Sequence, residues 1–436
     1  MSGTLASQSP AGLPSDAPLG ADARVERQTS YKAPIAYGIL GLIALIFFGV
    51  TTPGATESTF GISTRSDFLQ FSPIGVPSKA AGIVLGLIAI GIAVYSAVLV
   101  ATRRTAPVVL PYVFGVVWVF AFLTWAVAAE SISFVALLQG SLILAVPLVF
   151  GSMAGILCER AGVVNIAIEA QLLAGAFVAA IVATVTGNPW LGLIAAAIGG
   201  LIVSLLLAVF AIKYAVDQII VGVVLNVLII GITSFIYSQA LAKNGDLLNN
   251  PTAISRFKIP LLGDIPLVGP ILFNQSAIVY IMFLVVIGLH IALFKSKWGL
   301  RVRAVGEHPT AADTMGIKVN RTRYFNVMIS GLVAGLGGAF FTLGSGIGFA
   351  KEMTAGKGFI ALAAMIFGRW SPVGAFSAAL LFGFADNLQS ILGIIQTPIP
   401  SEFLQMAPYL ATIFAVAGLV GKSRAPAASG QAYEKG

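Results

Sequence analysis

Five polar side chains stand in a short and mostly apolar stretch of the chain, CERAGVVNIAIEAQLLAGA at positions 158–176. They are Glu159, Arg160, Asn165, Glu169 and Gln171. An ionisable group inside a lipid bilayer is costly unless it is shielded or lies at an interface. No nucleophile and base accompany these residues, so their chemistry is hydrogen bonding and charge pairing. We therefore expect binding or positioning here rather than catalysis.

The spacing divides these residues into two groups. Glu159 and Arg160 are expected at the cytoplasmic end of a membrane span, where water reaches them and opposite charges compensate each other. Asn165 and Glu169 are four residues apart and share one face of a helix, which should point to the bundle interior or to a water-filled path. Two alternatives stay open. For Asn165, the alternative is that its side chain caps the following helix. For Glu169, the alternative is that its carboxylate pairs with a group of the protein instead of a substrate.

Four further residues are candidates for the same path. Asn226 lies in another apolar run, eight residues after Gln218, where hydrogen bonds between helices are the commoner role. Phe359 stands beside two glycines and offers a ring on which a nucleobase stacks, unless it is only packing. Asp386 and Asn387 interrupt an apolar run and mark either an outer aqueous vestibule or a turn.

The composition indicates a membrane protein. Hydrophobic residues make up 58% of the chain and charged residues 10%, with a mean hydropathy of +0.95. The single cysteine, Cys158, excludes an internal disulfide, and two histidines without a Cys or carboxylate cluster give no metal-site pattern. The net charge of +8 is typical of basic cytoplasmic loops, and we expect no nucleic-acid partner.

The apolar runs predict an all-α, polytopic transmembrane bundle of about twelve segments, some short or interrupted, with a cytoplasmic coupling helix. The expected spans begin near Ala33, Ala80, Val108, Ser131, Ile166, Leu191, Gln218, Phe273, Tyr324 and Phe403, with two more in the apolar region broken at 368–372. We divide the chain into a disordered cytoplasmic leader (1–32), N-terminal transmembrane segments (33–130), a core transmembrane domain (131–421) and a cytoplasmic tail (422–436).

The distribution of basic residues predicts the orientation. The stretch 295–323 carries seven Lys and Arg against Glu307 and Asp313, so it is assigned to the cytoplasm. Counting spans from there places both termini in the cytoplasm and the Pro-rich loop 243–270 outside, as a solvated connector or a contact for an external partner. The protein is thus expected to be multi-pass in a cytoplasmic or inner membrane.

Within that basic stretch, the sequence WGLRVRAVGEHPTAADTMGIKVNRTRYFN at 298–326 is amphipathic and too polar to span. It suits a short helix lying at the cytoplasmic face. Pro309 can occupy the first turn, Ala311 and Ala312 allow close approach, and Gly316 ends the helix. Either a cytoplasmic partner docks there or the loop is merely solvated.

The segment GEHPTAADTMGIKV resembles the coupling loop of permease subunits from ABC importers that serve simple sugars, branched-chain amino acids and nucleosides. ERAGVVNIAIEAQLLAGA and TAGKGFIALAAMIFGRWSPVGAFSAALLFGFADNLQ agree with this, and the second is most similar to the nucleoside branch. The chain has Ala167 and Ala170 where the family usually has Gly, which affects helix packing only.

The resemblance implies a permease subunit that forms the translocation path for nucleosides delivered by an external binding lipoprotein or periplasmic protein. It also implies an ATP-binding subunit, a second and probably non-identical permease subunit, and the lipid bilayer as partners. The residues that it assigns to the ATPase coupling loop are Glu307, His308, Pro309, Ala311, Ala312 and Gly316.

This chain is expected to bind no cofactor, with ATP and Mg held by the partner ATPase. GKS at 421–423 is not a phosphate-binding loop, because Val416 stands where that motif needs Gly. Two alternatives stay open: a permease for a ribose-like sugar or an amino acid, and an ion-coupled secondary transporter. The latter would place paired carboxylates in the membrane, for which only Glu169 and Asp386 are available.

Overall fold

The computed structural model describes residues 30–63, 70–107, 109–395, 397, 403, 406 and 424–434. The chain forms two compact units, each considered by itself below. One comprises Met1–Thr52 and Lys79–Phe122, and the other comprises Pro53–Ser78 and Leu123–Gly436.

The first unit consists of apolar helices. They are α1 (Lys32–Ile43), which runs directly into the π-helical η1 (Ala44–Val50), α2 (Ser78–Ala101) and α3 (Leu110–Ala126). A Cβ at Gly86 would lie 2.6 Å from the Cα of Leu45, so glycine allows α2 to pack closely on η1. The Trp118 indole donates to the carbonyl of Leu40 at 3.0 Å, which joins α3 to α1.

The second unit begins with a small three-stranded sheet. Its strands are β1 (Glu57–Gly61), β2 (Ile74–Pro77) and β3 (Ser131–Ser133), in the order β2-β1-β3. β1 pairs antiparallel with β2 and parallel with β3, so that Thr59 lies opposite Gly75 and Ser131. Ser133 then caps the following helix by accepting from the amide of Ala136 at 3.2 Å. The sheet thus fixes where the helical part of this unit starts.

The remaining elements of the second unit are mainly helices, with one short hairpin. They are α4 (Phe134–Glu159), α5 (Ile168–Thr186), α6 (Pro189–Ala208), η2 (Val209–Lys213), α7 (Gln218–Ile236), η3 (Tyr237–Leu241), α8 (Gly245–Leu248), β4 (Arg256–Lys258), η4 (Leu262–Asp264), η5 (Gly269–Phe273), β5 (Asn274–Ser276), α9 (Ala277–Lys295), α10 (Lys297–Glu307), α11 (Pro309–Thr314), α12 (Val319–Leu343), α13 (Lys357–Phe367) and α14 (Pro372–Ile394).

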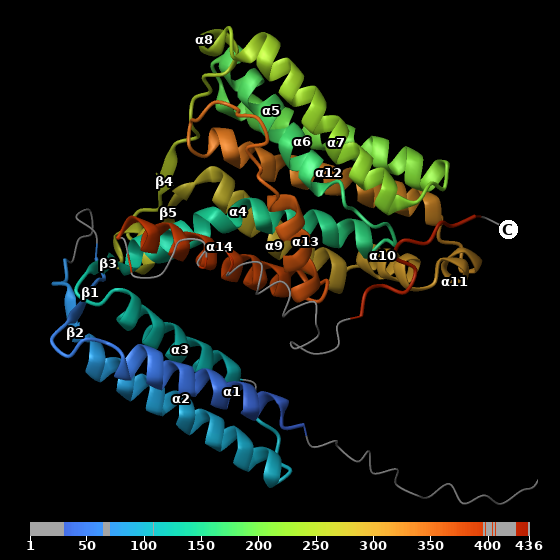
Figure 1. Cartoon of the computed structure of the whole chain (residues 1–436). Helices are drawn as coiled ribbons and strands as arrows, with labels where there is room; N and C mark the ends of the chain where they lie inside the picture. Colours follow the sequence, from blue (N-terminus) through green and yellow to red (C-terminus); the bar gives the residue numbers. More distant parts are fainter. Residues whose placement is uncertain are drawn as a thin grey trace, which may run out of the picture. The chain divides into compact units, whose positions relative to one another are not determined.

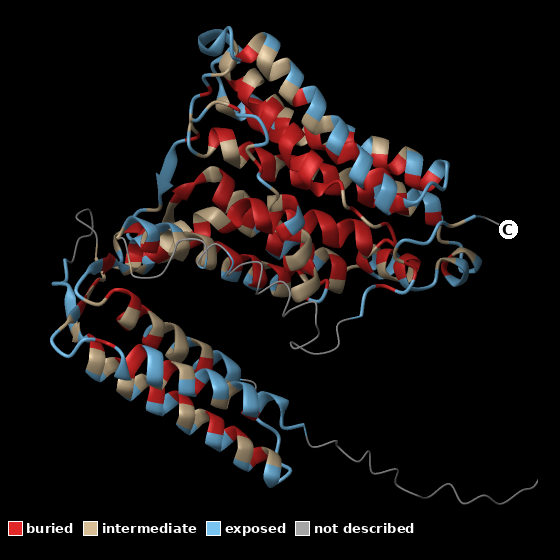
Figure 2. Cartoon of the chain, in the orientation of Figure 1, coloured by how far each residue is buried: buried red, intermediate tan, exposed pale blue. Residues whose placement is uncertain are grey.

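The core of this unit lies where α4, α5, α6 and α12 run side by side (Figure 1). Buried residues concentrate on α4, α5 and α12, whereas α7 is largely exposed (Figure 2). A Cβ at Gly338 would lie 2.1 Å from the carbonyl oxygen of Leu172, and one at Gly335 would lie 2.2 Å from that of Ala196. Glycines on α12 therefore bring its backbone directly against α5 and α6.

Nine helices within the described ranges are long and apolar enough to cross a membrane, and two shorter apolar helices, α3 and α13, accompany them. Eleven of the twelve expected segments are therefore present as helices, and the polytopic α-helical bundle is confirmed. The twelfth, expected to begin near Phe403, falls largely outside the described residues.

The break expected at 368–372 is confirmed as the turn between α13 and α14. A Cβ at Gly368 would lie 2.1 Å from the amide nitrogen of Ala375, so this turn accepts only glycine at its first position. Pro372 starts α14 in the first turn, where no amide hydrogen is needed.

Candidate functional site

The chain between α4 and α5 is a non-helical segment held by side chains of α7. Asn226 accepts from the amide of Ala170 at 2.9 Å and donates to the carbonyl of Ile166 at 3.0 Å. Gln218 accepts from the amide of Val164 at 2.7 Å. Asn226 therefore caps the start of α5, and the packing role expected for it and for Gln218 is the one that the structure shows.

Asn165 is fully buried in a polar network instead of capping α5. Its side-chain nitrogen donates to the side-chain oxygens of Gln171 and Ser330, both at 3.1 Å. Its side-chain oxygen accepts from the side-chain nitrogen of Gln171 at 3.3 Å. Gln171 in turn donates to Ser204 at 2.8 Å. The network joins α5, α6 and α12, and in a low-dielectric interior each of these bonds is strengthened.

Glu169 is 5% exposed and accepts three hydrogen bonds from the start of α13. Its Oε1 accepts from the hydroxyl of Thr354 at 2.6 Å and from the amide of Gly356 at 2.8 Å. Its Oε2 accepts from the amide of Gly358 at 2.6 Å. A carboxylate is well placed here, because the start of a helix presents free amides and a partial positive charge. The alternative of internal pairing thus accounts for this side chain.

Glu159 and Arg160 hold the other end of α13. Glu159 is buried and accepts from the indole of Trp370 at 2.5 Å, while Arg160 donates to the carbonyls of Trp370 at 3.0 Å and Arg369 at 3.4 Å. Both turn residues have positive φ, 55° at Arg369 and 52° at Trp370, a conformation that needs support from its surroundings. Burial lowers the pKa of the Arg160 guanidinium, and the charge of Glu307 opposes that shift.

Glu169 at one end and Glu159 with Arg160 at the other therefore clamp a single short helix. α13 has 11 residues and is about 16 Å long, roughly half the hydrocarbon thickness of a bilayer. Its start is bound by Glu169, and the turn that follows its end is bound by Glu159 and Arg160. Broken helices of this kind are found in membrane transporters at sites that bind or gate a substrate.

The outer candidates lie around the start of α13. Lys357 forms an ion pair with Asp386 of α14, with both side chains about four-fifths buried. Asn387 donates to the carbonyl of Leu137 at 2.7 Å and so ties α14 to α4. Phe359 is 49% exposed.

The short helix expected within 298–326 is confirmed as α11. It begins at Pro309, and Gly316 follows its end with φ 80°. Ala311 is exposed, as a docking surface requires. Ala312 is only 4% exposed and packs in a small cluster with Val305 and Val319.

The structure adds a contact that sequence reasoning missed, between the segment 424–434 and α10–α12. The amide of Ala428 donates to the carbonyl of Gly306 at 2.9 Å. Arg323, buried in α12, donates to the carbonyl of Gln431 at 2.8 Å, and Tyr433 packs on the Ala312 cluster. Burial and a hydrogen bond with Asp313 raise the pKa of Tyr433. The residues near the C-terminus are thus part of the α10–α11 surface.

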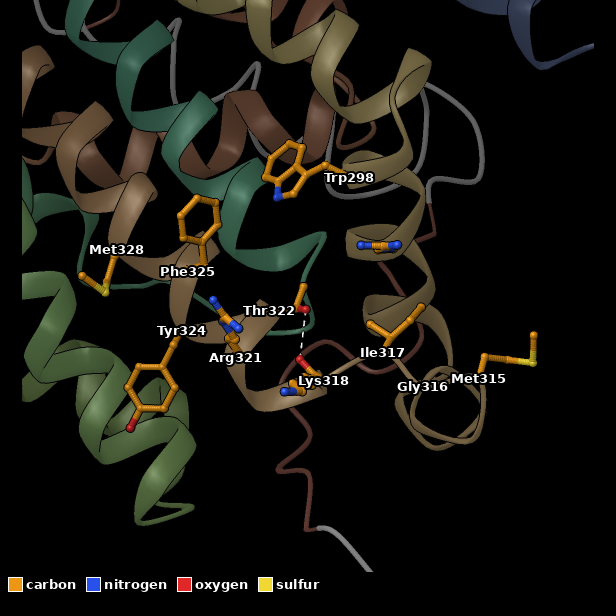
Figure 3. A pocket seen from close by; sticks show the side chains of 11 residues that line it. Trp298, Met315, Gly316, Ile317, Lys318, Arg321, Thr322, Tyr324, Phe325 and Met328 are labelled. Atoms are coloured by element: carbon orange, nitrogen blue, oxygen red, sulfur yellow. Dashed lines mark hydrogen bonds between the residues drawn. The ribbon is translucent and has the colours of Figure 1, made fainter.

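A cleft of about 900 Å³ lies beside this surface, between α10–α11 and the first turns of α12 (Figure 3). Arg301, Lys318 and Arg321 line it together with the exposed apolar side chains of Met315 and Phe325. Basic and apolar groups therefore line the same cleft.

Comparison with known proteins identifies the family. The model of a family described as the branched-chain amino acid transport system / permease component matches residues 137–420. The chain belongs to this permease family. The resemblance noted for GEHPTAADTMGIKV and its companion segments is confirmed, and the permease is a multi-pass membrane protein.

Three relatives show which permeases are similar. Over 312 residues the permease is 42% identical to the guanosine ABC transporter permease protein NupQ of Bacillus subtilis (strain 168), which covers 69% of this chain and 97% of that protein. Over 303 residues it is 39% identical to the nucleoside ABC transporter permease protein NupC of Lactococcus lactis subsp. cremoris, with 67% and 95% covered. Over 257 residues it is 35% identical to a putative glucose ABC transporter permease protein of Haloferax volcanii, with 58% and 76% covered. No solved structure matches the chain.

Proposed function

We propose that this permease forms the translocation path of an ATP-driven importer for nucleosides. The observation that carries the proposal is the 42% identity to a guanosine permease over 97% of that protein's length. The family match over residues 137–420 includes the residues that hold α13, from the α4–α5 segment to the turn before α14. A half-length helix clamped at both ends suits a gate whose position changes as a unit.

The permease is proposed to work with three protein partners. An ATP-binding subunit that carries ATP and Mg would dock at α10–α11, where Ala311 is exposed beside basic side chains. A second, related permease subunit would complete the path, and an external binding protein would deliver the substrate. This assignment puts α10–α11 and both termini on the cytoplasmic side, in agreement with the basic stretch 295–323.

The test is uptake of labelled guanosine, ribose and leucine by cells with and without this chain. We expect guanosine uptake to disappear with the chain and to return when it is restored. An ATPase subunit inactivated in its own nucleotide site should abolish the uptake, whereas an ionophore should leave its initial rate unchanged. If only ribose or leucine uptake is lost with the chain, that compound and not guanosine is the substrate. If uptake is sensitive to the ionophore but not to inactivation of the ATPase subunit, the result favours an ion-coupled carrier.

A further inference from the structure

A second cavity of about 610 Å³ lies within the helical unit, at the start of α13. Its walls come from α4, α9, α12 and α13 and from the β4–β5 hairpin, in which Phe257 lies opposite Gln275. Arg256 of the hairpin is exposed, whereas Ser276 and Val279 are buried. The cavity thus extends from solvent-exposed chain to the interior of the bundle.

Ser276 is the residue that points to a ligand. It is 6% exposed, it lines this cavity, and its hydroxyl has no hydrogen-bond partner among the described residues. Ser276 is also the N-cap of α9, yet its side chain accepts no bond from the helix amides. Buried hydroxyls nearly always find a partner, because an unpaired one destabilises the protein. A molecule in the cavity would supply that partner.

The rest of the lining defines the class of ligand. Phe340 and Phe341 of α12 contribute partly buried rings, and Pro147 of α4 adds an apolar surface. Lys357 supplies a cationic donor, but its charge is already balanced by Asp386. Arg256 adds a second cation at the exposed end of the cavity. Apolar ring walls with a few polar groups suit a flat molecule that carries hydroxyls.

Glu169 determines where Lys357 stands. Its carboxylate binds the amides on both sides of Lys357, those of Gly356 and Gly358. A Cβ at Gly358 would lie 2.5 Å from the amide nitrogen of Glu169, so the two elements are in direct contact. The carboxylate that holds α13 thus positions a cation of the cavity wall without lining the cavity itself.

We propose that this cavity is a nucleoside-binding subsite in which the hydroxyl of Ser276 hydrogen-bonds a ribose hydroxyl and the base packs against Phe340 and Phe341. The subsite rests on the proposed function and names the groups that would meet the substrate inside the permease. Phe359, the aromatic residue singled out from the sequence, does not line this cavity.

The test compares uptake of guanosine, 2′-deoxyguanosine and 3′-deoxyguanosine by the complete transporter carrying wild-type permease, Ser276→Ala or Ser141→Ala. Ser141 is a matched control, because it is buried but its hydroxyl donates to the carbonyl of Leu137 at 2.5 Å. Ser276→Ala should reduce guanosine uptake about 2- to 10-fold, the value of one hydrogen bond, and leave the uptake of one deoxy analogue unchanged. Since the external binding protein is the same in every assay, its own preference cancels in the ratio of variant to wild type.

A purely structural serine gives a different result. Removal of an unpaired buried hydroxyl would then leave all three uptake rates equal to wild type, or lower them all by the same factor, and either outcome overturns the subsite. If wild-type permease imports none of the three nucleosides, the proposed function itself fails and the subsite with it.

Photolabelling guards against a variant that does not fold. Irradiation of the wild-type transporter with 8-azidoguanosine should attach label to the peptides 275–279 or 340–345, and excess guanosine should prevent it. Label confined to other peptides overturns the subsite even if uptake of nucleosides is intact.

Discussion

Replacement of Glu169 tests the clamp on α13 most directly. Its two oxygens serve three donors: Thr354 and the amides of Gly356 and Gly358. Glu169→Ala leaves the backbone amides of Gly356 and Gly358 buried without a hydrogen-bond acceptor. Glu169→Gln keeps one oxygen for Thr354 and Gly356, but turns an amide N–H₂ group towards the Gly358 donor.

The expected magnitudes follow from the number of orphaned donors. A buried donor without an acceptor costs about 1–3 kcal/mol, so Glu169→Ala should lower the free energy of unfolding by about 2–6 kcal/mol. Glu169→Gln orphans one donor and should cost about 1–3 kcal/mol. Nucleoside uptake should fall in the same order, with the alanine variant lower than the glutamine variant at equal membrane abundance.

Hydrogen exchange of the Gly356 and Gly358 amides, measured by mass spectrometry on purified permease, gives a local measure of the clamp. Exchange should accelerate strongly in Glu169→Ala, and in Glu169→Gln it should accelerate at Gly358 more than at Gly356. Glu130→Ala, which alters an exposed carboxylate, is the control and should change neither amide. Unchanged exchange in Glu169→Ala would refute the clamp, and equal loss of uptake in both variants would show that the negative charge itself is required.

The remaining predictions concern orientation and docking. In permease lacking Cys158, a cysteine placed at Asn250 should react with an impermeant thiol reagent added outside and one at Thr310 should not; the opposite pattern would invert the topology. Ala311→Glu should leave the permease folded but reduce recovery of the ATP-binding subunit on co-purification, because Ala311 is exposed. Ala312→Glu should in addition lower the thermal stability of the permease, since it buries a charge in the subunit's own packing. Thermal stability equal to wild type in Ala312→Glu would contradict the packing described for α11.

The sequence was sufficient for much of the fold because hydrophobic runs and their interruptions are local signals. The break at 368–372 and the helix start at Pro309 were both found from Gly and Pro positions. The depth of Glu169 was also evident from its apolar neighbours, and the structure places it as buried.

The partners of these residues were not predictable in the same way. Glu169 meets a turn that begins 185 positions later, and no local pattern relates the two. Ser276 has an ordinary helix-start context, and only the absence of its expected cap bond distinguishes it. The contact of Gln431 with Arg323 depends on a buried arginine whose surroundings are long-range.

The separation of Glu169 from α13 also has a consequence for how the protein is made. Synthesis proceeds at about 5–20 residues per second, so roughly 10 to 40 s pass between the appearance of Glu169 and that of Thr354. Throughout that interval the carboxylate has no α13 to bind, and a carboxylate without a partner is not stable in hydrocarbon. Until α13 arrives, the carboxyl group of Glu169 therefore has either to stay in contact with water or to be neutralised by a proton. Substitutions that delay or prevent the folding of α13 will accordingly reduce the amount of folded protein in the membrane, independently of any effect on the transport rate.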